Sequence, residues 1–260
     1  MIQVAIIGAG FIGPAHLEAL RRLGDVEVVA LCDSRLEAAQ RKARALNIAH
    51  AYDSVEALLA HPGLQVVHNC TPNHLHAQIN RQILAAGLHV FSEKPLCMTA
   101  EEARELVALA ARAGVVHGVS FVYRQFAMVQ QAAAMIRHGE VGRIFAAHGS
   151  YLQDWMLLET DYNWRVDSAQ GGASRTVADI GSHWCDTVQF MTGRRIVEVM
   201  ADLSIVWPTR KAPVNGKATF SAVHEAQAYE TRPVDTEDFG SVLLRFDDGS
   251  KGCLLYTSDA

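Results

Sequence analysis

Four short motifs in this 260-residue chain carry groups that could take part in redox or acid–base chemistry. The first, Gly8-Ala9-Gly10-Phe11-Ile12-Gly13, follows an apolar run and opens a stretch with helical periodicity. Gly8 permits a tight turn, Gly10 lets the backbone approach a pyrophosphate, and Gly13 allows close packing of helix on strand. The N–H groups of the helix N-terminus point at the phosphates. In this context the motif predicts a dinucleotide site.

An acidic residue at the end of the second predicted strand supports that interpretation. Asp33 lies about 20 residues after Gly13, where a carboxylate hydrogen-bonds the adenosine ribose hydroxyls and repels a 2′-phosphate. Asp33 therefore favours NAD. Ser34 and Arg35 follow it, and an arginine at this place can pair with a 2′-phosphate or simply be a solvated helix residue. NADP stays open as an alternative.

The second motif, Cys70-Thr71-Pro72-Asn73-His74-Leu75-His76, ends a predicted strand. Ligands of open parallel sheets bind beyond the carboxyl ends of the strands, so this loop is expected beside the cofactor. His74 and His76 could suggest a metal, but no cysteine or carboxylate accompanies them at ligand spacing. We expect instead that Asn73 caps a helix and that one histidine lies near the cofactor.

The third motif, Glu93-Lys94-Pro95, ends the next predicted strand. A lysine held at the ligand edge of a sheet is a candidate electrostatic or acid–base group, with Pro95 fixing the turn. The alternative is a surface lysine without a role in chemistry.

The fourth motif runs from Asp179 to Asp186 and contains His183. On a helix Asp179 and His183 are i and i+4, so they share one face, and Asp186 falls three residues further along it. A carboxylate beside a histidine can orient the ring and raise its pKa toward the working pH, as a general base requires. The alternative is a capped or salt-bridged surface histidine.

The first half of the chain alternates strand-like and helix-like segments, which is typical of a doubly wound α/β domain. Near-continuous apolar runs suit a parallel sheet covered on both faces. The predicted strands are Ile2–Ile7, Glu27–Cys32, Gln65–Cys70, His89–Ser92 and Val115–Phe121. The predicted helices are Pro14–Leu23, Leu36–Leu46, Val55–Ala60, His74–Ala86 and Ala100–Ala113.

The pattern changes after Phe121 and indicates a second, α+β domain with an open-faced, mainly antiparallel sheet. We expect helices at Ala127–Arg137 and Thr176–Met191, and strands at Ile144–Leu152, Val197–Trp207 and Ser241–Phe246. The polar, proline-containing stretch from Pro208 to Asp238 is expected to be a long loop. The predicted domains are residues 1–121, a Rossmann domain, and residues 122–260, a substrate and oligomerisation domain.

Together these motifs resemble the Gfo/Idh/MocA family, that of glucose–fructose oxidoreductase and inositol dehydrogenase, over roughly Ile2 to Gly252. The resemblance is carried by GAGFIG, TPNHLH, SEKP, Trp164-Arg165 and the D-x-x-x-H of Asp179 and His183. It implies that Lys94, Asp179 and His183 are the catalytic trio. It also implies an NAD site formed by Gly8, Gly10, Phe11, Ile12, Gly13, Asp33, Ser34, Arg35, Thr71, Pro72, Asn73, His76, Glu93, Lys94, Trp164 and Arg165, the last two near the nicotinamide and substrate.

The resemblance predicts an NAD(P)-dependent oxidoreductase acting on a secondary alcohol of a sugar, sugar acid or cyclitol. In this interpretation His183 takes the hydroxyl proton, Asp179 orients it, and Lys94 stabilises negative charge on the same oxygen. Two alternatives are a glycoside hydrolase of the same family that retains NAD, and a non-catalytic regulator that senses a dinucleotide or sugar. Retention of the catalytic trio argues against the regulator.

Composition narrows the possible partners and compartment. The formal net charge is −5, and neither half has a basic excess, so nucleic acid is not an expected partner. Five cysteines without a CxxC pair favour a reducing compartment. We find no signal peptide and no membrane span in the sequence, and we expect a cytoplasmic protein with no metal.

The last eight residues raise a question about the C-terminus. Cys253-Leu254-Leu255-Tyr256-Thr257-Ser258-Asp259-Ala260 resembles the translation of a transposase adaptor used in shotgun sequencing. Members of the family usually continue for about another hundred residues, so we expect the second domain to be partial here. The full-length protein is expected to be a homodimer or homotetramer.

Overall fold

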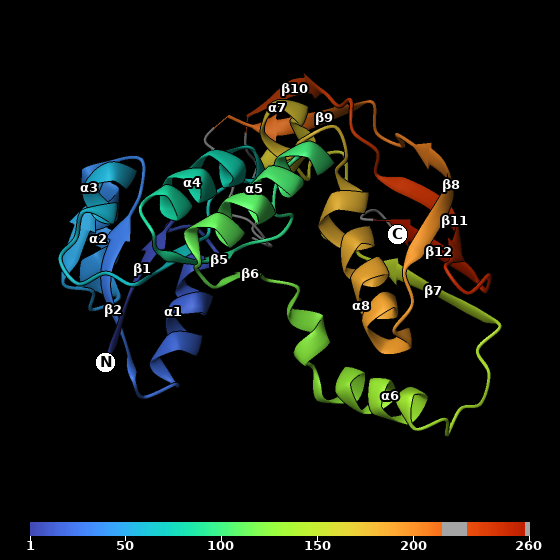
Figure 1. Ribbon diagram of the computed structural model, residues 1–260. Coiled ribbons are helices and arrows are strands. Elements are labelled where there is room, and N and C mark those ends of the chain that lie inside the picture. Colours follow the sequence, from blue (N-terminus) through green and yellow to red (C-terminus); the bar gives the residue numbers. More distant parts are fainter. Residues whose placement is uncertain (215–227, 258–260) are drawn as a thin grey trace. The chain divides into compact units, whose positions relative to one another are not determined.

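The computed structural model describes residues 1–214 and 228–257, which divide into two compact units, Met1–Ser120 and Phe121–Ala260. The first unit is built on a six-stranded parallel sheet in the order β3-β2-β1-β4-β5-β6 (Figure 1, blue to green). Its strands are β1 (Ile2–Ile7), β2 (Val26–Cys32), β3 (His50–Tyr52), β4 (Val66–Asn69), β5 (His89–Ser92) and β6 (His117–Val119). Its helices are α1 (Gly13–Arg21), α2 (Leu36–Ala45), α3 (Val55–Leu59), α4 (Asn73–Ala85) and α5 (Ala100–Ala113).

Alternating side chains of β1 explain why helices cover both faces of this sheet. Val4 and Ile6 pack with α1 and α2, whereas Ala5 and Ile7 pack with α3, α4 and α5. All four are almost fully buried. A strand that is apolar at every position is stable only between two covering layers. The strand order reverses between β1 and β4, so the crevice for a ligand lies at the carboxyl ends of these two strands.

The second unit contains a four-stranded sheet in the order β7-β12-β11-β8. Its strands are β7 (Ala146–Leu152), β8 (Ile196–Ser204), β11 (Phe239–Phe246) and β12 (Lys251–Thr257) (Figure 1). Pairing is antiparallel except between β12 and β7, which are parallel. The fold class predicted from the sequence, a Rossmann sheet followed by a mainly antiparallel open-faced sheet, is confirmed.

One face of this second sheet is buried and the other is exposed. Val242 and Leu244 of β11, with Leu254 and Tyr256 of β12, are buried in a core that also contains Ile180. The intervening side chains are exposed. The unit's helical segments are η1 (Val122–Gln125), α6 (Ala127–Arg137), η2 (Trp164–Val166), α7 (Ser168–Gly171), η3 (Val177–Gly181) and α8 (Ser182–Thr192).

Several predicted elements differ from the observed ones. The strand predicted at 115–121 is only β6, His117–Val119, and a 3₁₀ turn, η1, follows it. The short strand β3 was not predicted. The helix predicted over 176–191 is α8 preceded by the π-helical turn η3, which holds Asp179.

The prediction of a long loop from Pro208 to Asp238 is wrong for two segments of this stretch. Thr209–Pro213 and Tyr229–Pro233 form β9 and β10, an antiparallel ribbon; residues 215–227 lie outside the described residues. The polar strand β9 is anchored by Arg210. Its fully buried guanidinium donates to the carbonyl oxygens of Met156, Leu158 and Asp161. These partners lie about 50 residues away, where local patterning gives no signal.

Within residues 1–214 and 228–257, no helix combines the length and apolarity that a bilayer crossing requires.

Candidate active site

The glycine loop between β1 and α1 has the shape that a dinucleotide needs. Gly8 has φ +98°, and a Cβ there would lie 2.5 Å from the carbonyl oxygen of Cys70. A Cβ on Gly13 would lie 2.5 Å from the carbonyl oxygen of Gly8, so the helix packs directly on the loop. A Cβ on Gly10 would have no atom within 4 Å among the described residues, other than those of Gly10 and its two chain neighbours. The loop is therefore closed toward the protein and open on the side where a pyrophosphate would bind.

Asp33 holds this loop from the end of β2. One carboxylate oxygen accepts the backbone N–H of Ala9 at 3.1 Å, and the other accepts the backbone N–H of Ser34 at 2.7 Å. Arg35, the residue that would favour a 2′-phosphate, is exposed at the start of α2. The predicted glycine motif and Asp33 thus form one local structure that fits NAD.

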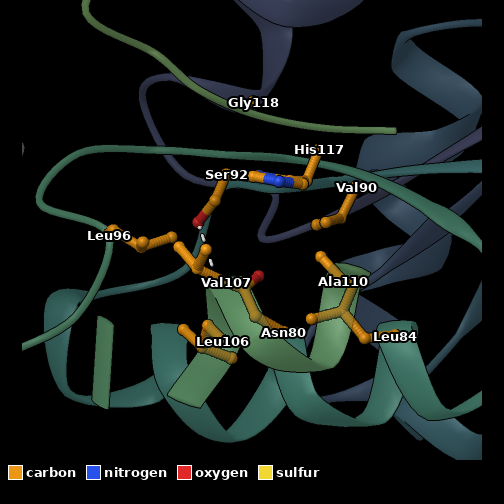
Figure 2. Close-up of a pocket in the computed structure, with 10 residues that line it drawn as sticks. All are labelled: Asn80, Leu84, Val90, Ser92, Leu96, Leu106, Val107, Ala110, His117 and Gly118. Atoms are coloured by element: carbon orange, nitrogen blue, oxygen red, sulfur yellow. Dashed lines mark hydrogen bonds between the residues drawn. The ribbon is translucent and has the colours of Figure 1, made fainter. Parts of the chain in front are cut away.

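The loop after β4 is fixed by a chain of buried amides and hydroxyls. Thr71 donates its N–H and its hydroxyl to Asn69 Oδ1, and Asn69 donates to Asn80 Oδ1 at 2.9 Å. Asn80 in turn donates to Ser92 Oγ at 3.0 Å. Figure 2 shows this last bond in a small, mainly apolar pocket. None of the predicted NAD-binding residues lines that pocket, so it is separate from the predicted cofactor site.

His76 lies beneath the loops rather than on their surface. Its Nδ1 is 2.6 Å from the carbonyl oxygen of Pro95, its Nε2 is 2.7 Å from that of Thr71, and the residue is 1% exposed. Burial lowers the pKa of His76, and the two carbonyl oxygens oppose that shift. His76 therefore braces the Thr71 loop against the Lys94–Pro95 loop.

Two expectations about this segment change. Helix α4 begins at Asn73 and its N-cap is Pro72, so Asn73 is the first helical residue and not the cap. His74 is exposed whereas His76 is buried, so the two side chains diverge. In the part of the chain that the structure describes, no group of three or more His, Cys, Asp or Glu residues is placed to hold a metal ion.

In the second unit, two motifs that are distant in the sequence meet. The Asp179 carboxylate on η3 lies 3.5 Å from Nε of Arg165. The Arg165 guanidinium also lies 4.6 Å from the ring centre of Trp164, and Asn163 Oδ1 accepts from it at 3.1 Å. Trp164 and Arg165 are predicted to lie near the nicotinamide and substrate, and Arg165 is a partner of Asp179.

His183 is buried between aromatic rings. Its imidazole stacks on Tyr123 with centroids 4.3 Å apart, and Phe121 approaches edge-on at 5.6 Å. The Tyr123 hydroxyl is hydrogen-bonded to that of Tyr151. Burial, the bond to Tyr123 and the charge of Asp179 raise the pKa of Tyr151, so this phenol stays protonated. The surface-histidine alternative is excluded, because His183 is only 7% exposed.

Sequence reasoning missed these aromatic neighbours and gave Asp186 only a place on the helix face of Asp179 and His183. The Asp186 carboxylate on α8 is bound through both oxygens by Arg124, with Nε at 2.7 Å from Oδ2. This ion pair holds η1, and with it Tyr123, against α8. The aromatic residues within 120–126 could have indicated these neighbours of His183. The predicted strand Val115–Phe121 covers part of this segment.

Comparisons with known proteins agree with this arrangement. Residues 2–121 match the family model described as "Oxidoreductase family, NAD-binding Rossmann fold", and residues 129–260 match the "GFO/IDH/MocA C-terminal domain". The chain is 30% identical over 269 residues to levoglucosan dehydrogenase from Pseudarthrobacter phenanthrenivorans, covering 100% of this chain and 68% of that protein. It is 34% identical over 196 residues to D-glucoside 3-dehydrogenase from Escherichia coli, covering 74% of this chain and 54% of that one.

A solved structure of similar fold carries both a nicotinamide cofactor and a sugar. The structure of levoglucosan dehydrogenase in complex with NADH and L-sorbose has a TM-score of 0.89 and 29% identity, covering 100% of this chain and 68% of that one. The chain thus spans about half to two thirds of the length of these relatives.

Proposed function

Because the chain belongs to the Gfo/Idh/MocA family of NAD-binding oxidoreductases, we propose that it transfers a hydride between NAD and a secondary alcohol of a sugar, sugar acid or cyclitol. Relatives named levoglucosan dehydrogenase, D-glucoside 3-dehydrogenase and D-apiose dehydrogenase support the substrate class. The observation that carries the proposal is the buried, ring-stacked position of His183, which suits an ionisable group with a chemical role.

The proposed roles follow from where each side chain is held. When bound, NAD supplies the hydride acceptor, and the protein must manage the proton of the hydroxyl. His183 takes that proton, because its ring is fixed by Tyr123 and Phe121 and needs no reorientation. Asp179, on the turn that precedes α8, has the role of orienting His183, and its carboxylate also lies 3.5 Å from Nε of Arg165.

Lys94 has the second role. It is the second residue after β5, at the carboxyl edge of the sheet where ligands bind. Its ammonium group donates to the alcohol oxygen and stabilises negative charge as the proton leaves. A lysine suits this task because the charge is compact and carries three donors.

Reduction of NAD by a panel of candidate substrates tests the proposal. The panel contains levoglucosan, methyl glucosides, free hexoses, aldonic acids and inositols, each assayed with NAD and with NADP at 340 nm. We expect NADH from at least one sugar, with little signal from NADP, and loss of that signal in Lys94→Ala. Glycoside cleavage without net NADH would instead favour the hydrolase. Tight NADH binding without any turnover would favour a sensor.

A further inference from the structure

Three polar residues from three elements of the first unit form a partly buried chain. His16 on α1 places Nε2 at 2.9 Å from Oε1 of Glu93, at the end of β5. Its other nitrogen, Nδ1, lies 2.8 Å from Nδ1 of His68 on β4. His16 is 8% exposed and the Glu93 side chain 13%. The second Glu93 oxygen, Oε2, accepts the backbone N–H of Lys94 at 3.2 Å. The chain therefore ends on the residue proposed to act in catalysis.

Hydrogen-bond chemistry sets where the protons of this chain lie. An ionised carboxylate can only accept, so Nε2 of His16 must carry a proton toward Glu93. A neutral His16 then has a lone pair on Nδ1, and the 2.8 Å contact is satisfied only if Nδ1 of His68 donates to it. His68 thereby supports, from the other side of the ring, the tautomer of His16 that Glu93 requires.

Without that donor the Nε2–H tautomer of His16 is held by Glu93 alone, and the opposite tautomer becomes less unfavourable. A proton on Nδ1 leaves a lone pair on Nε2, which faces the Glu93 carboxylate 2.9 Å away. Two acceptors at this distance repel, and Glu93 would move or take up a proton. Either change weakens the bond from Oε2 to the Lys94 backbone N–H.

We propose that His68 is a positioning residue for Lys94, acting through the tautomer of His16 and the orientation of Glu93. The inference rests on the proposed function, since it assigns His68 a part in holding the lysine that acts on the alcohol. Glu93 was predicted to line the NAD site; His16 and His68 were not predicted to take part.

The surroundings of His68 and Glu93 keep these two groups in the protonation states that the chain requires. Burial lowers the pKa of His68 to about 4, helped by His16 and opposed by Glu93, so His68 is neutral and can act as the donor. Burial alone would raise the pKa of Glu93, but bonds from His16 and Ser120 outweigh it and the pKa is lowered. Cys70, His76 and Lys94 are further titratable groups near Glu93 among the described residues.

Packing restricts the two imidazoles as well. The rings of His16 and His68 meet edge-to-face at 5.1 Å, and Phe91 lies against both, at 5.9 Å and 5.1 Å. His68 and Phe91 are register partners on adjacent strands. Because Phe91 confines the His16 ring on this side, the ring cannot easily flip to exchange its two nitrogens. Loss of the His68 donor would therefore act on the tautomer of His16 and not on the orientation of its ring.

The wild-type chain allows a first test that does not depend on turnover. Nitrogen-15 NMR of the histidine rings at pH 7.5 reads the tautomers directly. We expect His16 as the Nε2–H form and His68 as the Nδ1–H form. A His16 ring protonated on Nδ1 alone would overturn the inference, and this measurement needs no variant to fold.

Variants test the effect on Lys94. His68→Phe keeps an aromatic ring but removes the donor, whereas His68→Asn places an amide N–H near the position of Nδ1–H. In His68→Phe we expect hydrogen exchange at the Lys94 amide to be about tenfold faster and kcat to be about tenfold lower, with KM for the sugar and NADH affinity unchanged. His68→Asn should restore both values to near wild type. His50→Phe, an exposed histidine on β3, is the control.

The two proposals fail in different ways. If wild type reduces no NAD with any sugar, the proposed function fails. The NMR measurement of the histidine tautomers and the hydrogen exchange rate of the Lys94 amide still test the inference in that case. If wild type turns over and His68→Phe matches it in both kcat and Lys94 exchange, the inference is overturned and the function stands. An equal loss in His68→Phe and His68→Asn also overturns it, because the donor would then be irrelevant.

Discussion

The imidazole of His183 stacks on the ring of Tyr123, with an interplanar angle of 22°. The residue after Tyr123, Arg124, is bound by Asp186, which lies on α8 one turn beyond His183. The same helix therefore carries the proposed base and the anchor of the ring that orients it.

Loss of the Arg124 anchor should release η1. Arg124→Met leaves Asp186, whose side chain is 10% exposed, without its cation. We expect the free energy of unfolding to fall by about 1–2 kcal/mol, less than for a fully buried pair, because Arg124 is itself 44% exposed. Urea unfolding monitored by tryptophan fluorescence measures this. Arg137→Met, on the exposed face of α6, is the matched control, and equal stability of the two variants would contradict the prediction.

Removal of either proposed acid–base group should slow turnover without loss of cofactor. Lys94→Ala and His183→Ala are each expected to lower kcat by about a hundredfold or more, the usual size of general acid–base effects. NADH affinity, measured by fluorescence titration, should stay within about threefold. His138→Ala, at an exposed position, is the control. Near-normal turnover in either variant would remove that residue from the mechanism.

The glycine loop offers a matched pair of substitutions. Gly8→Ala adds a Cβ 2.5 Å from a backbone oxygen at φ +98°, so we expect a loss of stability of about 2–5 kcal/mol. Gly10→Ala meets no atom within 4 Å and should fold like wild type. Its NADH affinity should nevertheless fall about tenfold or more, because the methyl group enters the space of the pyrophosphate. Thermal melting and NADH titration separate the two effects; unchanged affinity in Gly10→Ala would count against the site.

Asp33 should control the choice of cofactor. Asp33→Asn weakens the bond that holds the Ala9 N–H and removes the charge that repels a 2′-phosphate. We expect NAD affinity to fall about tenfold and the preference for NAD over NADP to shrink. Parallel titrations with NADH and NADPH measure both quantities. The preference should be unaltered in Asp25→Asn, which changes an exposed aspartate just before β2.

Stability should fall as the pH drops below about 6.5. The pKa of His68 is about 4 in the folded chain and 6.5 ordinarily, so between these values the unfolded chain binds more protons. Protons therefore favour unfolding in this window, by up to about 3 kcal/mol at its lower end. The lowered pKa of His76 acts in the same direction. Urea unfolding at several pH values measures how the free energy of unfolding changes with pH. In His68→Asn this free energy should fall less steeply below pH 6.5 than in wild type; an unchanged dependence on pH would refute the assignment.

Local sequence patterns were enough for five of the six strands of the first sheet and for the cofactor loop. The apolar run at Ile2–Ile7, the glycines that follow it and Asp33 at the end of the next strand are read from neighbours in the chain. The parallel order then follows, because right-handed crossovers leave few topologies open. The same local reading failed at Pro208–Asp238, where β9 depends on the burial of Arg210.

The sequence by itself determined the fold class, the family resemblance and the residue types available for chemistry. Only the tertiary structure decided which side chains meet: His16 with His68 and Glu93, 52 and 77 positions away, and Arg124 with Asp186, 62 positions away. Periodicity records whether a side chain is buried but not against which partner. Long-range hydrogen bonds between polar groups leave no periodic trace, because each depends on how separate strands and helices come together.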